Sequence, residues 1–295
     1  MTVCVAAMCA INTIFGASDR MLTAGDIQFE PEQPKIYPVS NSIAVQVAGD
    51  ASIQEQIMQA VFRDVGKRIQ EAPDEWRNVR DVAELYRRHY QELRLAHAEH
   101  DILAPLGLDR NTWLTKQKEM DSGLVIKIAT ELMNYEWQGT AAIVSGVDTT
   151  GAHIYTARDG AISCEDSVGF AAIGAGEGHA DSQLMFDRHD RHKSIPETLL
   201  LVYSAKKRAE VAPGVGEDTD MFSVGPGLGT FAAIPPDILD GLGDIYQAEQ
   251  ERHREAAETA KGEVTKYVEK LTKEAAEQAQ TTKPLDGGGD TSPNS

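Results

Sequence analysis

The sequence has few cysteines and lacks any long apolar run. Its three cysteines, Cys4, Cys9 and Cys164, are an odd number without a C-x-x-C pair, which argues against a disulfide framework or a thiolate zinc site and fits a reducing compartment. No run approaches the ~18 apolar residues of a membrane span. The apolar stretch 3–17 has no Lys or Arg before it, unlike a signal peptide, and Asp19 and Arg20 follow at once. We therefore expect a cytoplasmic protein without a membrane partner.

Basic residues are also scarce relative to acidic ones. The 295 residues include 28 Lys and Arg against 46 Asp and Glu, a formal net charge of −18. Nucleic acids and anionic membranes would repel such a chain, so we predict that it binds neither. Its length is ample for a large hydrophobic core that needs no metal for stability. His179, His189 and His192 suggest metal ligands, but a charged loop between two helices explains them better. We predict no metal and no cofactor.

Short apolar runs bounded by turn residues predict strands. They cover residues 3–8, 14–17, 36–38, 43–49, 141–146, 153–157, 161–164 and 219–224. Apolar residues at three- and four-residue steps predict helices. They cover residues 53–69, 79–97, 126–137, 178–187, 199–211 and 247–280. Strands grouped in hairpins and helices grouped in pairs favour an α+β fold over a parallel βαβ sheet.

Several segments fall outside this pattern. Residues 102–122 are irregular and are interpreted as an inserted segment, and residues 170–178 as a glycine-rich connection. The predicted helix over 247–280 is rich in charge and has a thin apolar stripe, so we expect a solvated helix; a coiled-coil or ring-docking helix is the alternative. Residues 283–295 have the composition of a disordered tail. The predicted organisation is a domain over 1–240 followed by a charged helix and tail over 241–295.

The chain begins Met1-Thr2, and methionine before a small residue is normally removed. The mature chain would then start with a threonine that carries both a hydroxyl and a free α-amine. An α-amine has a pKa of about 7.7–8.0, so near neutral pH one residue would hold a nucleophile and its general base. Many proteins begin with Met-Thr by chance, and this signal alone is weak.

The residues that follow Thr2 strengthen this interpretation. They form a set with regular spacing: Thr2, Ser18-Asp19-Arg20, Thr23, Lys35-Ile36-Tyr37-Pro38 and Val47-Ala48-Gly49. This set resembles the amino-terminal half of proteasome β-type subunits and of bacterial proteasome-like proteins. The sixteen-residue step from Asp19 to Lys35 and the fourteen-residue step from Lys35 to Gly49 match the family pattern without gaps. The step from Thr2 to Asp19 is one residue longer, which a turn near Ile11 can absorb.

The second half of the chain agrees in order. Residues 144–148 resemble the family's GG-x-D strand, residues 174–176 its glycine-rich loop, and residues 204–208 the end of its fourth helix. The resemblance covers roughly residues 2–225. It implies a four-layer α-β-β-α sandwich and an N-terminal nucleophile hydrolase, here a threonine-type peptidase acting on peptides or unfolded proteins.

The resemblance also assigns roles to individual residues. Thr2 would be the nucleophile through its hydroxyl and the base through its amine. Lys35 would be the neighbouring cation, and Asp19 would hold Lys35 by a charge-assisted hydrogen bond. The Gly49 N–H would stabilise the oxyanion. Thr23 would align the substrate chain as an added strand.

The same register suggests a specificity pocket. Its predicted lining is uncharged: Met21, Leu22, Gln33, Val47 and Ala51. We therefore expect a neutral or apolar side chain before the scissile bond.

The sequence departs from the family pattern in the supporting residues. The family's loop serine falls on Ala175, and its later Asp and Ser do not align cleanly. Glu210, Asp218 and Thr219 are candidates for those roles.

The departures leave two alternative functions open. One is a non-catalytic, proteasome-like assembly subunit. The other is an amidohydrolase acting on a small-molecule amide, with residues 102–122 reshaping the cleft. The resemblance further implies a homo-oligomeric ring, whose stoichiometry the helix faces do not determine, and allows an ATP-dependent unfoldase as partner.

Overall fold

The structure is a computed structural model that describes residues 2–24, 27–31, 34–73, 75–137 and 139–281. It is a mixed α/β fold with two five-stranded antiparallel sheets. The chain divides into two compact units, Met1–Leu242 and Gly243–Ser295. The first unit contains both sheets and is described first.

The first sheet has the amino-terminal strand in its interior. Its order is β10 (Phe170–Gly174), β1 (Val3–Cys9), β2 (Thr13–Ser18), β11 (Asp220–Val224) and β12 (Ala232–Ala233). The predicted hairpin over residues 3–17 is confirmed, with Cys4 opposite Ser18 and Cys9 opposite Thr13. The prediction of a connection over 170–178 is wrong in its first part, because β10 pairs with the other side of β1. A five-residue strand made by a long-range partner carries little local signal.

The second sheet runs in chain order. Its strands are β5 (Ile36–Ser40), β6 (Ile43–Gly49), β7 (Thr140–Asp148), β8 (Gly151–Arg158) and β9 (Ala161–Cys164). All four pairings are antiparallel. The predicted Asp159-Gly160 turn joins β8 to β9, with both residues at positive φ, as a tight hairpin of this kind requires.

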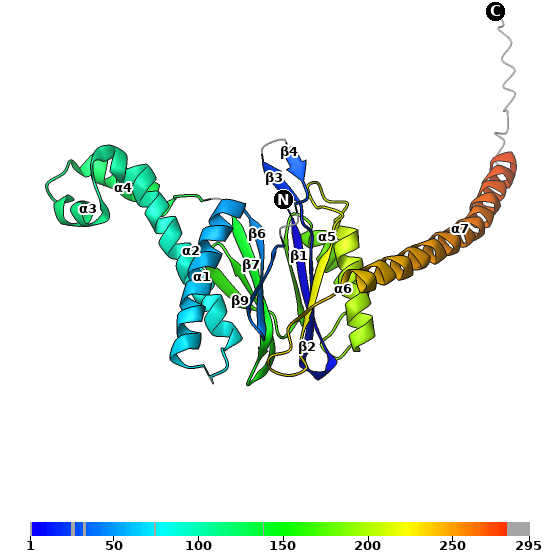
Figure 1. Cartoon of the computed structure of the whole chain (residues 1–295). Coiled ribbons are helices and arrows are strands. Elements are labelled where there is room, and N and C mark those ends of the chain that lie inside the picture. Colours follow the sequence, from blue (N-terminus) through cyan, green and yellow to red (C-terminus); the bar gives the residue numbers. More distant parts are fainter. Residues whose placement is uncertain (1, 25–26, 32–33, 74, 138, 282–295) are drawn as a thin grey trace, which may run out of the picture. The chain divides into compact units, whose positions relative to one another are not determined.

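The two sheets pack face to face, and helices cover their outer faces (Figure 1). Between the sheets, Cys4, Ala6 and Met8 of β1 pack against residues such as Ile143 and Ile154 of the second sheet. The alternation of β1 places its other residues toward the helices, and all seven are buried. This explains why β1 reads as a continuous apolar run rather than an alternating one.

Helices α1 (Ala51–Glu71) and α2 (Val79–Ala98) pack on the second sheet through a large apolar cluster. Helices α5 (Glu177–Phe186) and α6 (Ile195–Ala209) pack on the first sheet. Asp50 caps α1, and Ser194 with Glu197 forms the predicted capping box of α6. These caps supply acceptors to backbone N–H groups that have no partner within the helix.

The region interpreted as an irregular insertion is largely helical. It contains the end of a π-helix (Glu99–Leu103), a 3₁₀ turn (Ala104–Leu106) and α3 (Arg110–Lys116). The next helix, α4 (Ser122–Met133), begins at its last residue and corresponds to the helix predicted over 126–137. Leu103, Trp113 and Ile128 form a small core of their own. The short helices were missed because Pro105 and Gly107 interrupt the periodicity that predicts a helix.

A small hairpin was not predicted from the sequence. Strands β3 (Leu22–Ala24) and β4 (Ile27–Phe29) form a separate two-stranded sheet close to the amino-terminal end of the described chain (Figure 1). Ile27 and Phe29 expose 67% and 47% of their surface. Three-residue strands with exposed side chains leave no period-2 pattern in the sequence.

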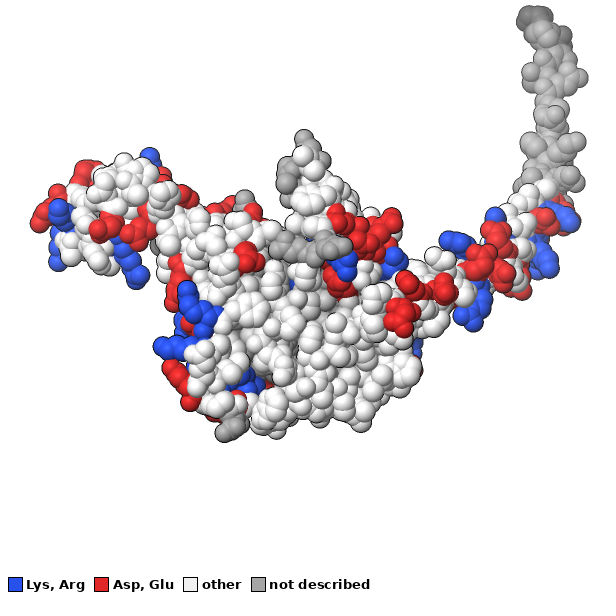
Figure 2. Space-filling model, viewed as in Figure 1, with Lys and Arg blue, Asp and Glu red and all other residues white. Residues whose placement is uncertain are grey.

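Helix α7 (Pro236–Thr281) continues into the second unit. Basic and acidic side chains alternate along it (Figure 2), and it carries ion pairs such as Glu258–Lys261 and Lys270–Glu274. The predicted helix is confirmed, and Val264 and Leu271 of its apolar stripe expose more than half of their surface in this chain. The predicted tail over 283–295 lies outside the described residues. In the ranges described, no helix combines the length and apolar character needed to cross a membrane.

A substitution at Gly16 would test how tightly the first sheet is packed. Gly16 lies opposite Phe222, and a Cβ added to it would approach Phe222 Cε1 to 2.2 Å. Overpacking of this kind costs ~1–3 kcal/mol. We expect Gly16→Ala to lower the urea midpoint accordingly. Gly66→Ala in α1 is the control: its Cβ meets nothing within 4 Å, and we expect about 0.5–1 kcal/mol of stabilisation. Unchanged stability of Gly16→Ala would contradict a rigid contact with Phe222.

Candidate active site

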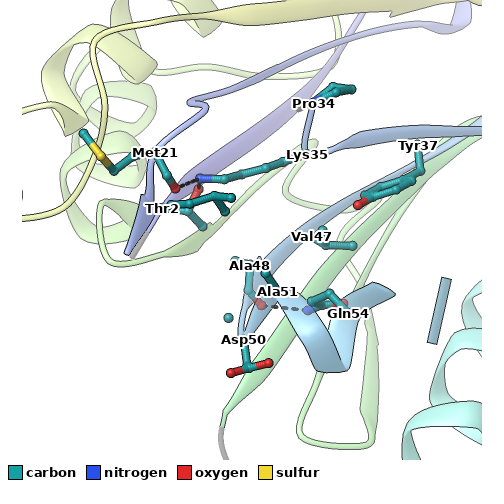
Figure 3. Close-up of a pocket in the computed structure, with 12 residues that line it drawn as sticks. Thr2, Met21, Pro34, Lys35, Tyr37, Val47, Ala48, Asp50, Ala51 and Gln54 are labelled. Atoms are coloured by element: carbon teal, nitrogen blue, oxygen red, sulfur yellow. Dashed lines mark hydrogen bonds between the residues drawn. The ribbon is translucent and has the colours of Figure 1, made fainter. Parts of the chain in front are cut away.

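Thr2 lies at the start of β1 with its hydroxyl inside the protein. It exposes only 3% of its surface. Its Oγ1 donates a hydrogen bond to Asp19 Oδ1 and accepts one from Lys35 Nζ. Figure 3 shows the Lys35 side chain extending toward Thr2. The three predicted polar residues are therefore brought into direct contact.

Asp19 is fully buried at the end of β2. Besides Thr2, its Oδ1 accepts hydrogen bonds from Val3 N at 3.0 Å and Lys35 Nζ at 2.9 Å. Its Oδ2 accepts from Met21 N at 3.2 Å and Gly216 N at 3.0 Å. A buried carboxylate requires this kind of compensation, since an unpaired buried charge is strongly unfavourable.

Lys35 immediately precedes β5 and is 7% exposed. Its ammonium donates to Thr2 Oγ1, to Asp19 Oδ1 and to the Met21 carbonyl at 2.7 Å. An ammonium has three donors, so all three have acceptors. The cation is thus held in one position, with the hydroxyl of Thr2 as one of its acceptors.

Gly49 ends β6, directly before α1. Its φ is 119°, and a Cβ at this position would come within 2.6 Å of the Gly139 carbonyl oxygen. Both features restrict this position to glycine. Asp50 then caps α1 by accepting from the N–H groups of Ser52 and Ile53. The chain turns sharply here, and Gly49 lines the same cavities as Thr2.

The first of these cavities has an empty volume of about 660 Å³ and contains most of the predicted pocket (Figure 3). Met21, Leu22, Val47 and Ala51 all line it. Thr23 lies in β3 opposite Gln28, and Gln33 lies outside the described residues. Within the described part of the chain, Lys35 and Asp50 are the charged residues of the lining.

Three polar residues of this cavity, Tyr37, Asp50 and Gln54, were not among the predicted site residues. Gln54 is buried, donates to the Ala48 carbonyl at 2.8 Å and accepts from Tyr86 Oη at 2.8 Å. These bonds stiffen the turn between β6 and α1. A glutamine on the apolar face of a predicted helix was the available signal.

A second cavity, with an empty volume of about 680 Å³, also borders Thr2 and was not predicted. It shares Thr2, Ala48 and Gly49 with the first. Its further lining comes from distant segments: Gly139, Thr140, Ala141, Arg158, Asp159, Gly174, Ala175 and Glu177. Residues 102–122 contribute nothing to the described lining of either cavity beside Thr2. The expectation that this segment reshapes the cleft is therefore wrong.

The glycine-rich loop allows close approach to Thr2. A Cβ at Gly174, whose φ is 96°, would lie 2.3 Å from the Thr2 carbonyl oxygen, and Gly176 N donates to that oxygen at 3.3 Å. Ala175 between them lines the second cavity with a methyl group. The loop thus positions the Thr2 backbone without a side-chain hydroxyl.

Glu210 and Thr219, two of the candidates for the family's later Asp and Ser, have other partners in the structure. Glu210 is paired with Lys206 and Lys207, and Thr219 Oγ1 donates to the Glu217 carbonyl at 3.4 Å. In the described ranges, the contact of this loop with Asp19 is made by the Gly216 backbone instead. Backbone N–H groups leave no residue-type signal, which is why the sequence did not identify Gly216.

The three histidines named as candidate metal ligands lie in different environments. His189 is buried, and its Nε2 lies 2.9 Å from the Met8 carbonyl oxygen. Burial is the main factor lowering the pKa of His189, so a core histidine replaces the predicted charged loop residue at this position. His179 and His192 are exposed. The described residues contain no group of three or more His, Cys, Asp or Glu placed to hold a metal ion.

Cys4, two residues from Thr2, is an unreactive thiol. Burial raises its pKa far above the usual range, an effect that the positive charge of Lys35 only partly offsets. Burial raises the pKa of Cys9 to about 11. Because thiolates are the reactive form, we expect iodoacetamide at neutral pH to modify the exposed Cys164 in the native protein. Cys4 and Cys9 should react only after denaturation. Peptide mass mapping checks this, and native modification of Cys4 would contradict it.

An acidic cluster lies near the second cavity. Desolvation, followed by repulsion from Glu177, raises the pKa of Asp181 from 3.8 to about 6. The folded state therefore holds this proton more tightly than the unfolded state. The contribution of the protonated Asp181 carboxyl to the free energy of unfolding is fully present below about pH 4 and is lost as the pH rises through about 6.

We expect Asp181→Asn to raise the unfolding free energy at pH 7.5 by about 1 kcal/mol, after discounting for partial exposure, and to leave it unchanged at pH 4. Thermal denaturation at both pH values measures this difference. Asp240→Asn, at an exposed position, is the control. Equal effects of Asp181→Asn at the two pH values would contradict the shifted pKa.

Comparison with known proteins gives no independent assignment: no protein-family model and no curated protein matches this sequence.

Proposed function

We propose that this chain is a threonine-type peptidase that uses the amino terminus of Thr2, after removal of Met1, to hydrolyse peptide bonds. The observation that carries the proposal is the buried contact of the Thr2 hydroxyl with both Lys35 and Asp19. The proposed fold is the four-layer α-β-β-α sandwich of N-terminal nucleophile hydrolases, related to proteasome β-subunits. The two facing sheets with helices outside support it.

In the proposed reaction, the free α-amine of Thr2 accepts the proton of Oγ1 as that oxygen attacks the peptide carbonyl carbon. The Lys35 ammonium, held by Asp19, stabilises the developing negative charge on Oγ1. The Gly49 N–H donates to the oxyanion. The carbon–nitrogen bond breaks, and the α-ammonium returns the proton to the leaving amine. Water, activated by the α-amine, then hydrolyses the ester and regenerates Thr2.

The cavity geometry supports a substrate that extends on both sides of the reacting bond. Two cavities share Thr2 and Gly49 in their linings, and their other lining residues come largely from different segments. The cavity lined by Met21, Leu22 and Val47 would accept a neutral or apolar residue before the scissile bond, and the other cavity would accept the leaving segment. A small-molecule amide needs only one of these cavities, which favours a peptide substrate over the amidohydrolase alternative.

Assembly belongs to the same proposal. A homo-oligomeric ring, peptide or unfolded-protein substrates and an ATP-dependent unfoldase partner follow from the resemblance to proteasome β-subunits. Cytoplasmic location and the absence of nucleic-acid binding follow from the sequence composition.

The test is intact mass spectrometry of the purified full chain before and after incubation with a peptide epoxyketone, which reacts with amino-terminal threonine. We expect loss of Met1 and one adduct per chain. Thr2→Ala should abolish labelling and lower peptide hydrolysis by at least ~10³-fold. Thr2→Ser, which keeps a hydroxyl and an α-amine, should keep measurable activity.

Four outcomes would contradict the peptidase. If Met1 is retained, Thr2 has no free α-amine to act as the base. If Thr2→Ala hydrolyses peptides as fast as wild type, Thr2 is not the nucleophile. A ring that forms but shows no adduct identifies a non-catalytic assembly subunit. Faster turnover of small amides than of peptides, in a competition assay, identifies an amidohydrolase.

A further inference from the structure

A lysine is completely buried behind the proposed active site. Lys206 lies in α6 and has no exposed surface. It lies on the buried stripe of this helix together with Thr198, Val202 and Ala209. Lysine is rarely fully buried unless it is paired, so its environment requires an explanation. It was not among the predicted site residues.

All three donors of the Lys206 ammonium have acceptors. Nζ donates to Glu210 Oε1 at 2.6 Å, to the Gly216 carbonyl at 3.0 Å and to the Glu217 carbonyl at 2.8 Å. Desolvation is the main factor lowering the pKa of Lys206, and the Glu210 carboxylate opposes it. The ammonium therefore links the end of α6 to the loop that follows it.

That loop reaches Asp19. Gly216 N donates to Asp19 Oδ2 at 3.0 Å, and the Gly216 carbonyl accepts from Lys206. One residue thus connects the two charged groups. Gly216 itself is buried, and a Cβ there would collide with Glu30 Oε1 at 1.5 Å. The loop lies close against the carboxylate that holds Lys35, and Asp19 has no exposed surface.

We propose that Lys206 is a positioning residue that holds the 212–217 loop on Asp19, so that the Asp19–Lys35 pair keeps one orientation toward Thr2. The inference rests on the proposed function for its catalytic consequence. The link runs from Lys206 through the Gly216 peptide to Asp19, and from there to Lys35 and Thr2. Through this link, the Lys206 ammonium and the Gly216 backbone support the Asp19–Lys35 pair. In the glycine-rich loop beside Thr2, Ala175 offers no hydroxyl that could give such support.

The test compares Lys206→Met with Lys207→Met in the full chain. Both remove one ion pair with Glu210, and each leaves the other lysine to neutralise it. Only Lys206 binds the loop carbonyls. We expect Lys206→Met to lower the epoxyketone labelling rate and kcat by roughly 10–100-fold, as small misplacements do. KM should change little, because Lys206 does not line the substrate cavities. Lys207→Met should behave as wild type.

Hydrogen exchange provides a readout that does not depend on activity. Amides of residues 212–219 should exchange faster in Lys206→Met than in wild type or Lys207→Met, with α1 unchanged. If Lys206→Met does not fold, Lys206→Gln replaces it. Its amide offers two donors for the two carbonyls, so we expect a smaller acceleration and a smaller loss of kcat.

The possible outcomes separate this inference from the proposed function. If the wild type does not react with the epoxyketone but amides 212–219 exchange faster in Lys206→Met, the peptidase proposal is overturned and the contact between Lys206 and the loop is supported. If the wild type reacts with the epoxyketone and folded Lys206→Met has the same kcat as the wild type, the positioning role is overturned and the peptidase proposal stands. Unchanged exchange of residues 212–219 would also overturn the positioning role. A lower melting temperature with unchanged kcat would show a purely structural lysine.

Discussion

The buried carboxylate of Asp19 is the constraint on which the rest of the site depends. It accepts hydrogen bonds from Thr2, Val3, Met21, Lys35 and Gly216. These donors come from the beginning of β1 and the residue before it, the link between β2 and β3, the residue before β5 and the loop before β11. A charge without solvent must be satisfied by the protein. Satisfying it brings together segments that are far apart in the sequence and positions the Thr2 hydroxyl beside an ammonium.

The two sheets make this convergence possible. β1 and β2 belong to one sheet, whereas β5 and β6 belong to the other. Thr2 and Asp19 therefore approach from one layer, and Lys35 and Gly49 from the other. The apolar contacts between the sheets set the distance between these layers. Gly49 and Gly174 then allow backbone approaches that a Cβ would block. The space left beside Thr2 forms two cavities that share Thr2, Ala48 and Gly49 in their linings.

Much of the local structure could be predicted from the sequence, because its signals are local. The helix that ends near Pro73 and the capping box at Ser194 depend on neighbouring residues, and both are found in the structure. Strand β10 and the β3–β4 hairpin were missed, since five and three residues carry too little periodicity. For the site, the resemblance to proteasome β-type subunits singled out Thr2, Asp19, Lys35 and Gly49. The structure places Thr2, Asp19 and Lys35 in contact and Gly49 in the lining of the same cavities.

The sequence by itself determined the residue types: one hydroxyl after Met1, an aspartate and a lysine at fixed spacing, and glycines where the backbone must turn. Only the tertiary structure decided which groups support them. Lys206 and the Gly216 N–H lie close to two hundred residues from Asp19 in the chain and act partly through backbone atoms. Their contacts arise from long-range packing around a buried charge, and no local pattern of side chains encodes such a contact.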